Sequence, residues 1–197
     1  MAAFTSGDAV SVANETGPRR HRLTVRDYYR MAEVGLLRPD ERVELIEGEI
    51  IDMPPIGSLH GAVVDLLAER LITALKGSAL VRIQGAIRLG DASEPQPDIA
   101  ILRSRPDRYA GDHPRAADVL LVIEVSDTTL EFDTGVKARL YARHGVPELW
   151  VADLTNRQLC VFRSPHGGEY SERTTRDAGV IEIPGLATSV DLTGLFL

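Results

Sequence analysis

The 197-residue sequence has a single cysteine, Cys160, which excludes an internal disulfide framework and a cysteine-rich zinc site. This cysteine usage fits a reducing compartment. No apolar run approaches the ~20 residues that span a bilayer. Residues 1–20 are small and polar, without the apolar core of a signal peptide. We therefore expect a cytoplasmic protein without a membrane segment, whose residues 1–22 form a disordered tail.

A basic excess is also missing, because the net charge is −7 and the sequence pI is about 5.3. Proteins that bind phosphate backbones usually carry a net positive charge. The negative net charge therefore disfavours a protein that binds nucleic acid through its overall charge alone. A nuclease stays compatible with this charge, since acids that hold a metal lower the total while local arginines can guide a strand. The arginines fall in two clusters: Arg19, Arg20 and Arg22, and Arg103, Arg105, Arg108 and Arg115. The alternative interpretation is that both clusters lie in solvated loops without a binding role.

Several common catalytic signatures are absent. The chain has no glycine-rich phosphate loop, no Gly-x-Ser-x-Gly elbow and no HExxH zinc motif. Cys160 precedes Val161 and Phe162 in an apolar stretch, which indicates a small core residue before a nucleophile. Any chemistry must therefore come from acids, lysine or histidine held by the fold.

Helical and extended patterns alternate along residues 23–197, which predicts a single α/β domain whose mixed central sheet is flanked by helices. Helices are expected over 25–34, 58–76 and 131–144, starting after Thr24, at Ser58 and near Thr128 or Thr129. Their predicted core positions are Val63, Leu67, Leu71 and Leu75 in the second helix, and Phe132, Val136 and Leu140 in the third.

Extended segments make up the rest of the predicted domain. Residues 43–53 read as a hairpin that turns at Gly48. The most apolar strand is expected to be central in the sheet. The predicted strands are 80–89, 97–103, 119–126 (the central one) and 147–153, followed by a C-terminal run of short strands at 159–162, 168–173 and 179–183.

Two strands carry an acid that a sheet does not ordinarily need. Glu124 ends the apolar run of residues 119–125, and desolvating an unpaired carboxylate costs several kcal/mol. Asp98 opens the preceding strand, directly after Pro97. A loop joins these strands, so they can pair and present both acids side by side. The alternatives are a solvent-exposed acid for Asp98, and for Glu124 a buried ion pair with Arg88 or Arg139.

Lys137 follows Glu124 by 13 residues and falls in the next predicted helix, from which it can reach back over the end of the sheet. Carboxylate oxygens suit a hard cation such as Mg²⁺, which lowers the pKa of a bound water. A nearby lysine can orient that water or stabilise charge on a phosphate. Asp98 and Glu124 therefore predict a metal site for phosphodiester hydrolysis, assisted by Lys137. The alternative for Lys137 is a helical ion pair with Asp133.

Three further residues are candidates for support of this site. Glu44 lies in the predicted hairpin, where acids often only face solvent. His60 lies at the start of a helix, where a capping or packing role is the alternative. Gln84 precedes the acids and can hydrogen-bond near them. Tyr141 and Trp150 are expected to be core aromatics.

At these positions the chain resembles the Uma-type family of putative restriction endonucleases, within the PD-(D/E)XK nuclease superfamily. The resemblance runs from Thr24 to the C-terminus, and its segments are 44–49, 60–61, 97–98, 123–126, Lys137 and 141–151. It implies a restriction-endonuclease-like core, Mg²⁺ dependence with Mn²⁺ as a substitute, and cleavage of nucleic acid, with DNA favoured. Asp98 and Glu124 would bind the metal, and Lys137 would take the lysine position.

One departure from the superfamily motif concerns the lysine, which there follows the second acid by two residues. Ser126 holds that place here, and family members move the lysine to the next helix, so Lys137 inherits the role by a spatial argument. The resulting hypothesis is an endonuclease that attacks phosphodiesters with a metal-bound water, as a homodimer by family habit. The alternatives are a catalytically inactive binding or scaffold protein on the same fold, and a metal-free hydrolase with two acids, such as a glycosidase.

Overall fold

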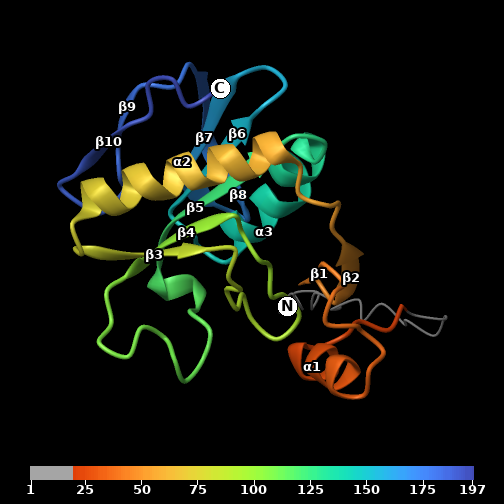
Figure 1. Cartoon of the computed structure of the whole chain (residues 1–197). Coiled ribbons are helices and arrows are strands. Elements are labelled where there is room, and N and C mark those ends of the chain that lie inside the picture. The colour runs from red at the N-terminus through yellow and green to blue at the C-terminus, as the bar shows by residue number, and fades with distance from the viewer. Residues whose placement is uncertain (1–19) are drawn as a thin grey trace, which may run out of the picture.

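The computed structural model describes residues 20–197, so residues 1–19 of the tail expected over 1–22 lie outside the described part (Figure 1). The helical elements are α1 (Val25–Glu33), α2 (Ser58–Leu75), η1 (Ala116–Asp118), the π-helix η2 (Phe132–Lys137) and α3 (Ala138–Arg143). The strands are β1 (Val43–Ile46), β2 (Glu49–Asp52), β3 (Ala79–Ile83), β4 (Ile99–Arg103), β5 (Val119–Ser126), β6 (Glu148–Asp153), β7 (Gln158–His166), β8 (Glu169–Arg176), β9 (Val180–Glu182) and β10 (Ser189–Asp191).

A six-stranded mixed sheet forms the centre, in the order β3-β4-β5-β6-β7-β8. Only the β5–β6 pair is parallel, and the connection between these strands contains η2 and α3. All eight residues of β5 are buried, which confirms the prediction that the most apolar strand is interior. The two smaller sheets, β1–β2 and β9–β10, are antiparallel pairs.

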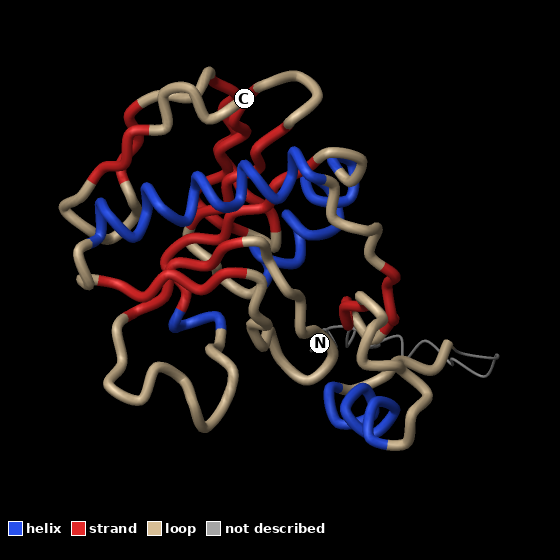
Figure 2. The backbone as a smooth tube through the Cα atoms, viewed as in Figure 1, coloured by secondary structure: helices blue, strands red, loops and turns tan. Residues whose placement is uncertain are grey.

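Helices cover both faces of this sheet, with α2 on one side and α3 on the other (Figures 1 and 2). Each face has its own apolar cluster, because side chains alternate along a strand. On β5, Ile123 packs in the cluster with α2 and Val122 in the cluster with α3. The predicted inward stripe of the long helix is confirmed, since all four of its members are buried: Val63, Leu67, Leu71 and Leu75.

The β1–β2 hairpin turns at Glu47 and Gly48, which have φ values of 50° and 77°. Glycine is needed at the second position, because a Cβ there would lie 2.7 Å from the Cβ of Arg22. The Gly48 N–H donates to the Ala92 carbonyl oxygen at 2.7 Å, and the Glu94 N–H donates to the carbonyl oxygen of Leu45 at 2.8 Å. These bonds tie the hairpin to the segment that precedes β4.

The predicted end of one strand and the predicted cap of one helix are wrong. The strand expected over 80–89 ends at Ile83, because Gln84 has a left-handed φ of 45° and its N–H donates to the Asp98 carbonyl oxygen. Ser58 does not cap α2; Gly57 is the N-cap residue and makes no side-chain capping bond. By contrast, Thr24 and Asp27 form a reciprocal capping box at the start of α1.

The helix predicted over 131–144 is divided into the π-helix η2 and the α-helix α3. Of the three apolar residues predicted to face the core, Leu140 is fully buried, while Phe132 and Val136 are only partly buried. Asp133 and Lys137 are the fully buried residues of η2. The prediction assumed one continuous α-helix with a 3.6-residue period, whereas residues 132–137 form a π-helix, whose hydrogen bonds run from i to i+5. This segment therefore directs charge toward the sheet.

Candidate active site

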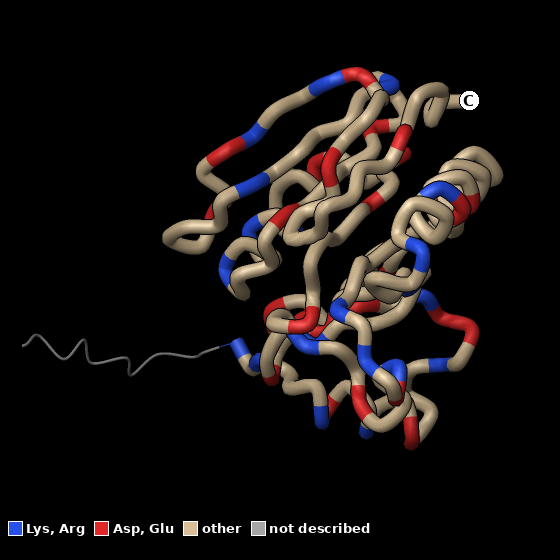
Figure 3. The backbone as a smooth tube through the Cα atoms, turned by 90° about the vertical axis from the view of Figure 1, so that its left-hand side faces the viewer, with Lys and Arg blue, Asp and Glu red and all other residues tan. Residues whose placement is uncertain are grey.

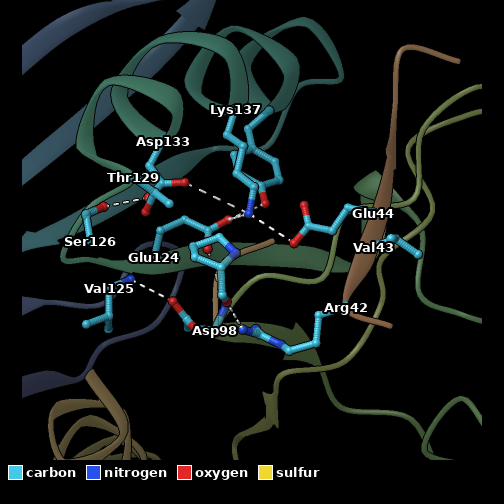
Figure 4. A network of polar contacts seen from close by, with 12 residues as sticks. Arg42, Val43, Glu44, Asp98, Glu124, Val125, Ser126, Thr129, Asp133 and Lys137 are labelled. Atoms are coloured by element: carbon cyan, nitrogen blue, oxygen red, sulfur yellow. Dashed lines mark hydrogen bonds and ion pairs between the residues drawn. The ribbon is translucent and has the colours of Figure 1, made fainter. Parts of the chain in front are cut away.

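Asp98 and Glu124 lie side by side, where β4 begins and near the end of β5. Asp98 directly precedes β4, and the antiparallel register that pairs Ile99 with Ile123 places Glu124 opposite it. The Asp98 N–H makes a long hydrogen bond of 3.4 Å to Glu124 Oε2. Asp98 is 8% exposed and Glu124 is 3% exposed, so the solvent-exposed alternative for Asp98 is wrong. Figure 4 shows both acids within one network of polar contacts.

The Asp98 carboxylate is fixed from two directions. Its Oδ2 accepts the Val125 N–H at 2.8 Å and lies 3.1 Å from His60 Nε2. His60 belongs to the first turn of α2. The site therefore receives side chains from helices on both faces of the sheet, His60 from α2 and Lys137 from η2. The hydrogen bond to Asp98 raises the pKa of His60 above its usual value. His60 Nδ1 is buried and has no hydrogen-bond partner within residues 20–197.

Lys137 extends into the centre of the network from the last position of η2. Its Nζ donates to Glu124 Oε1 at 3.1 Å and to Glu44 Oε1 at 3.2 Å, and it lies 4.0 Å from Asp133 Oδ1. Burial alone would lower the pKa of Lys137, but the combined attraction of Glu124, Glu44 and Asp133 outweighs it and raises that pKa. The ammonium group therefore stays charged although the residue is 1% exposed.

Glu124 is the acid most affected by this environment. Burial raises its pKa to about 8, the negative charges of Asp133, Asp98 and Glu44 add to the rise, and Lys137 opposes it. Its Oε1 also accepts the Tyr141 hydroxyl at 2.6 Å. The alternative of a partner arginine is wrong, because Lys137 and Tyr141 are the partners and Arg88 pairs with Glu94.

Glu44 reaches the site from β1, a segment far from the other acids in sequence. It is buried rather than solvent-facing, and burial raises the pKa of its carboxyl. Oε1 accepts from Lys137, while Oε2 is buried and has no hydrogen-bond partner in the described part of the chain. A buried carboxylate oxygen without a donor is costly, so a cation or a proton at this position would stabilise the site.

Asp133 joins the lysine to the end of β5. Its Oδ2 accepts the hydroxyl groups of Ser126 at 2.7 Å and Thr129 at 2.6 Å. Ser126 therefore bonds the acid that faces Lys137. From the sequence, Asp133 was predicted only as a helical partner of Lys137 and Tyr141 only as a core aromatic. The available signal was a run of hydroxyl and acidic residues directly after a buried strand.

A cavity of about 220 Å³ opens onto these groups. Its wall includes an apolar segment from Met53 to Ile56. Gln84 does not line it: this exposed residue contacts Asp98 through its backbone, and its side chain lines a neighbouring depression that also includes Glu44. The acids that line the cavity are Glu44, Asp98, Glu124, Asp127 and Asp133, and its cationic residues are Arg42 and Lys137, with His60 beside them.

The donor set fits a hard divalent cation. Within residues 20–197 no group of three or more His, Cys, Asp or Glu side chains is placed to hold a metal ion, so a cation here would have two protein carboxylates at most. Mg²⁺ commonly binds one or two protein carboxylates and keeps several waters, so Asp98 and Glu124 match the number of ligands that a protein usually supplies. The excess of acids over cations in the cavity and the unpartnered Oε2 of Glu44 both favour added positive charge.

Comparisons with known proteins agree with this architecture. Residues 25–193 match the Uma2 family, described as "Putative restriction endonuclease". The fold resembles the crystal structure of a putative nuclease belonging to DUF820 from Anabaena variabilis, with a TM-score of 0.63 and 20% sequence identity. That alignment covers 83% of this chain and 94% of the Anabaena chain. No curated protein matches the sequence. None of the helices within residues 20–197 is long and apolar enough to cross a membrane. Because the family match extends over most of the chain, the protein belongs to the Uma2 family of putative restriction endonucleases.

Proposed function

We propose that this protein is a cytoplasmic, Mg²⁺-dependent endonuclease that hydrolyses phosphodiester bonds in nucleic acid, with DNA as the favoured substrate. One observation carries the proposal: Asp98 and Glu124 lie side by side at the floor of an open cavity, with the Lys137 ammonium 3.1 Å from Glu124. Paired strand acids beside a charged lysine are the groups that such hydrolysis needs.

In the proposed mechanism Asp98 and Glu124 hold the cation, with Mn²⁺ as an alternative. When bound, a divalent cation neutralises phosphate charge and lowers the pKa of a coordinated water. Lys137 donates N–H groups toward charge that develops on the phosphate, because its ammonium stays protonated at neutral pH. Tyr141 fixes the Glu124 carboxylate, and His60 fixes that of Asp98. The active form would be a homodimer, since two sites can cut two strands.

A binding or scaffold protein without activity is the second candidate. The observation that favours it is the direct contact of Lys137 with both Glu124 and Glu44, through which the ammonium already compensates buried acids. In that case the cluster would serve the fold alone. The two candidates differ in whether a divalent cation binds at Asp98.

The test is cleavage of supercoiled plasmid by wild type and by Glu124→Gln, each with Mg²⁺ and with EDTA. Wild type should nick or linearise the plasmid only with Mg²⁺, and Glu124→Gln should be inactive while keeping its fold, as judged by circular dichroism. Equal activity of the two proteins would remove Glu124 from the mechanism. Lack of cleavage of plasmid and of RNA by wild type would support the scaffold protein instead.

A further inference from the structure

Arg42 stands at the mouth of the cavity, directly before β1. It is an exposed residue, yet it lines the same cavity as Asp98 and His60. In Figure 4 the side chain extends from the end of β1 toward Asp98. A substrate that enters the cavity would therefore meet this guanidinium before it reaches the acids.

Most donors of this guanidinium are unused. Nη1 donates to the Pro54 carbonyl oxygen at 2.5 Å, which fixes the side chain against the segment between β2 and α2. Within residues 20–197 this is the only hydrogen bond of the Arg42 side chain, and no carboxylate lies within 4.0 Å of it. Arg38, four residues earlier, is instead paired with both Asp40 and Glu41. An arginine carries five N–H donors, so Arg42 has several left for a ligand.

An anionic substrate needs a cationic group near the cavity, because the protein and the cavity floor are acidic. The net charge is −7, and acidic and basic segments alternate in the view of Figure 3 rather than forming one basic face. Acids line the cavity floor and would repel a phosphate on its approach. The N-terminal end of α2 lies on the same rim, where Gly57 provides no side-chain acceptor and the helix dipole adds positive potential. Arg42 is the group here with free donors and a full charge.

We propose that Arg42 binds a phosphate of the nucleic-acid backbone at the mouth of the cavity and places the neighbouring phosphodiester over Asp98 and Glu124. This inference rests on the proposed function. An arginine fork suits two phosphate oxygens, and a backbone contact of this kind positions the substrate without reading its sequence. Arg42 should therefore contribute affinity that is independent of the base sequence.

The test measures binding of a fluorescent DNA duplex by anisotropy in EDTA, where the proposed chemistry is blocked, over a range of salt concentrations. The proteins are wild type, Arg42→Gln, Arg42→Lys and the matched control Arg38→Gln. Loss of one phosphate contact should reduce the slope of log K against log salt by about 0.9. Arg42→Gln should show this reduction and bind about tenfold more weakly on each duplex sequence tested. Arg42→Lys should keep the slope, and Arg38→Gln should match wild type.

Two results would overturn the inference: a wild-type slope and affinity in Arg42→Gln, or no salt-dependent DNA binding by wild type. Melting temperatures of the variants show whether a loss of binding reflects unfolding. Cleavage with Mg²⁺ separates this inference from the proposed function. If Arg42→Gln lowers the slope but wild type cuts no substrate, the nuclease proposal fails and the phosphate contact stands. If wild type cuts and Arg42→Gln keeps the wild-type KM and slope, the nuclease proposal stands and the phosphate contact of Arg42 fails.

Discussion

Replacement of Lys137 by methionine tests whether the buried cluster depends on its ammonium. The ammonium contacts Glu124 and Glu44 at 3.1 and 3.2 Å, with all three side chains buried. Removing one partner of a buried ion pair costs about 3–5 kcal/mol, because a carboxylate is left without compensation. For a chain of this size that corresponds to a fall in melting temperature of roughly 6–20 °C.

The loss should also depend on pH. The pKa of Glu124 is raised to about 8 by burial, so the folded state binds the proton more tightly than the unfolded state. Wild-type stability should therefore fall as the pH rises from the unfolded value of 4.5 through about 8. Lys137 lowers this pKa, so its removal raises the pKa further and extends the loss to higher pH. The difference in unfolding free energy between wild type and Lys137→Met should be small near pH 5 and large near pH 9.

The assay is thermal denaturation by circular dichroism at several pH values, in EDTA. Lys76→Met is the matched control, because Lys76 is an exposed residue at the C-cap of α2 and its loss should change stability by no more than about 0.5 kcal/mol. A Lys137→Met variant that melts like Lys76→Met would show that the buried acids do not depend on the Lys137 ammonium. So would a destabilisation of equal size at low and high pH.

Three further predictions follow from the same contacts. Mg²⁺ should raise the melting temperature of wild type, by the equivalent of about 2.7 kcal/mol at a hundredfold excess over Kd, and Asp98→Ala should lose this gain; an equal gain in both proteins would move the metal elsewhere. Tyr141→Phe removes the donor 2.6 Å from Glu124 Oε1 and should cost about 1.5–3 kcal/mol in urea unfolding; an unchanged midpoint would contradict that hydrogen bond. Gly48→Ala should destabilise the hairpin by more than about 1 kcal/mol, because φ is 77° and the added Cβ meets Arg22, and wild-type melting would disprove the strain.

The sequence was most informative where the signal is local. Periodic leucines and valines predicted α2 and its buried stripe, and an unbroken apolar run predicted the interior position of β5. The strands of Asp98 and Glu124 are joined by one loop, so their antiparallel pairing was a short inference from chain order. Burial of both acids then follows from their place in the sheet.

The sequence was least informative where partners are distant or the backbone is irregular. Glu44 approaches Lys137 across 93 residues, and a hairpin pattern alone does not say on which side it docks. The strand after Ala79 stops early because Gln84 takes a left-handed conformation to bond Asp98, which strand propensity does not encode. Asp133 and Lys137 are buried within the π-helix η2, and a 3.6-residue pattern does not predict a π-helix.

The proposed function requires that Asp98 and Glu124 jointly hold the cation on which cleavage depends. Its most direct test is the rate of plasmid nicking as a function of Mg²⁺ concentration in wild type, Asp98→Asn and the exposed control Asp65→Asn. We expect wild type and Asp65→Asn to share one Mg²⁺ dependence, and Asp98→Asn to be inactive or to need far more Mg²⁺. An Asp98→Asn protein with the wild-type rate and Mg²⁺ dependence would contradict this requirement.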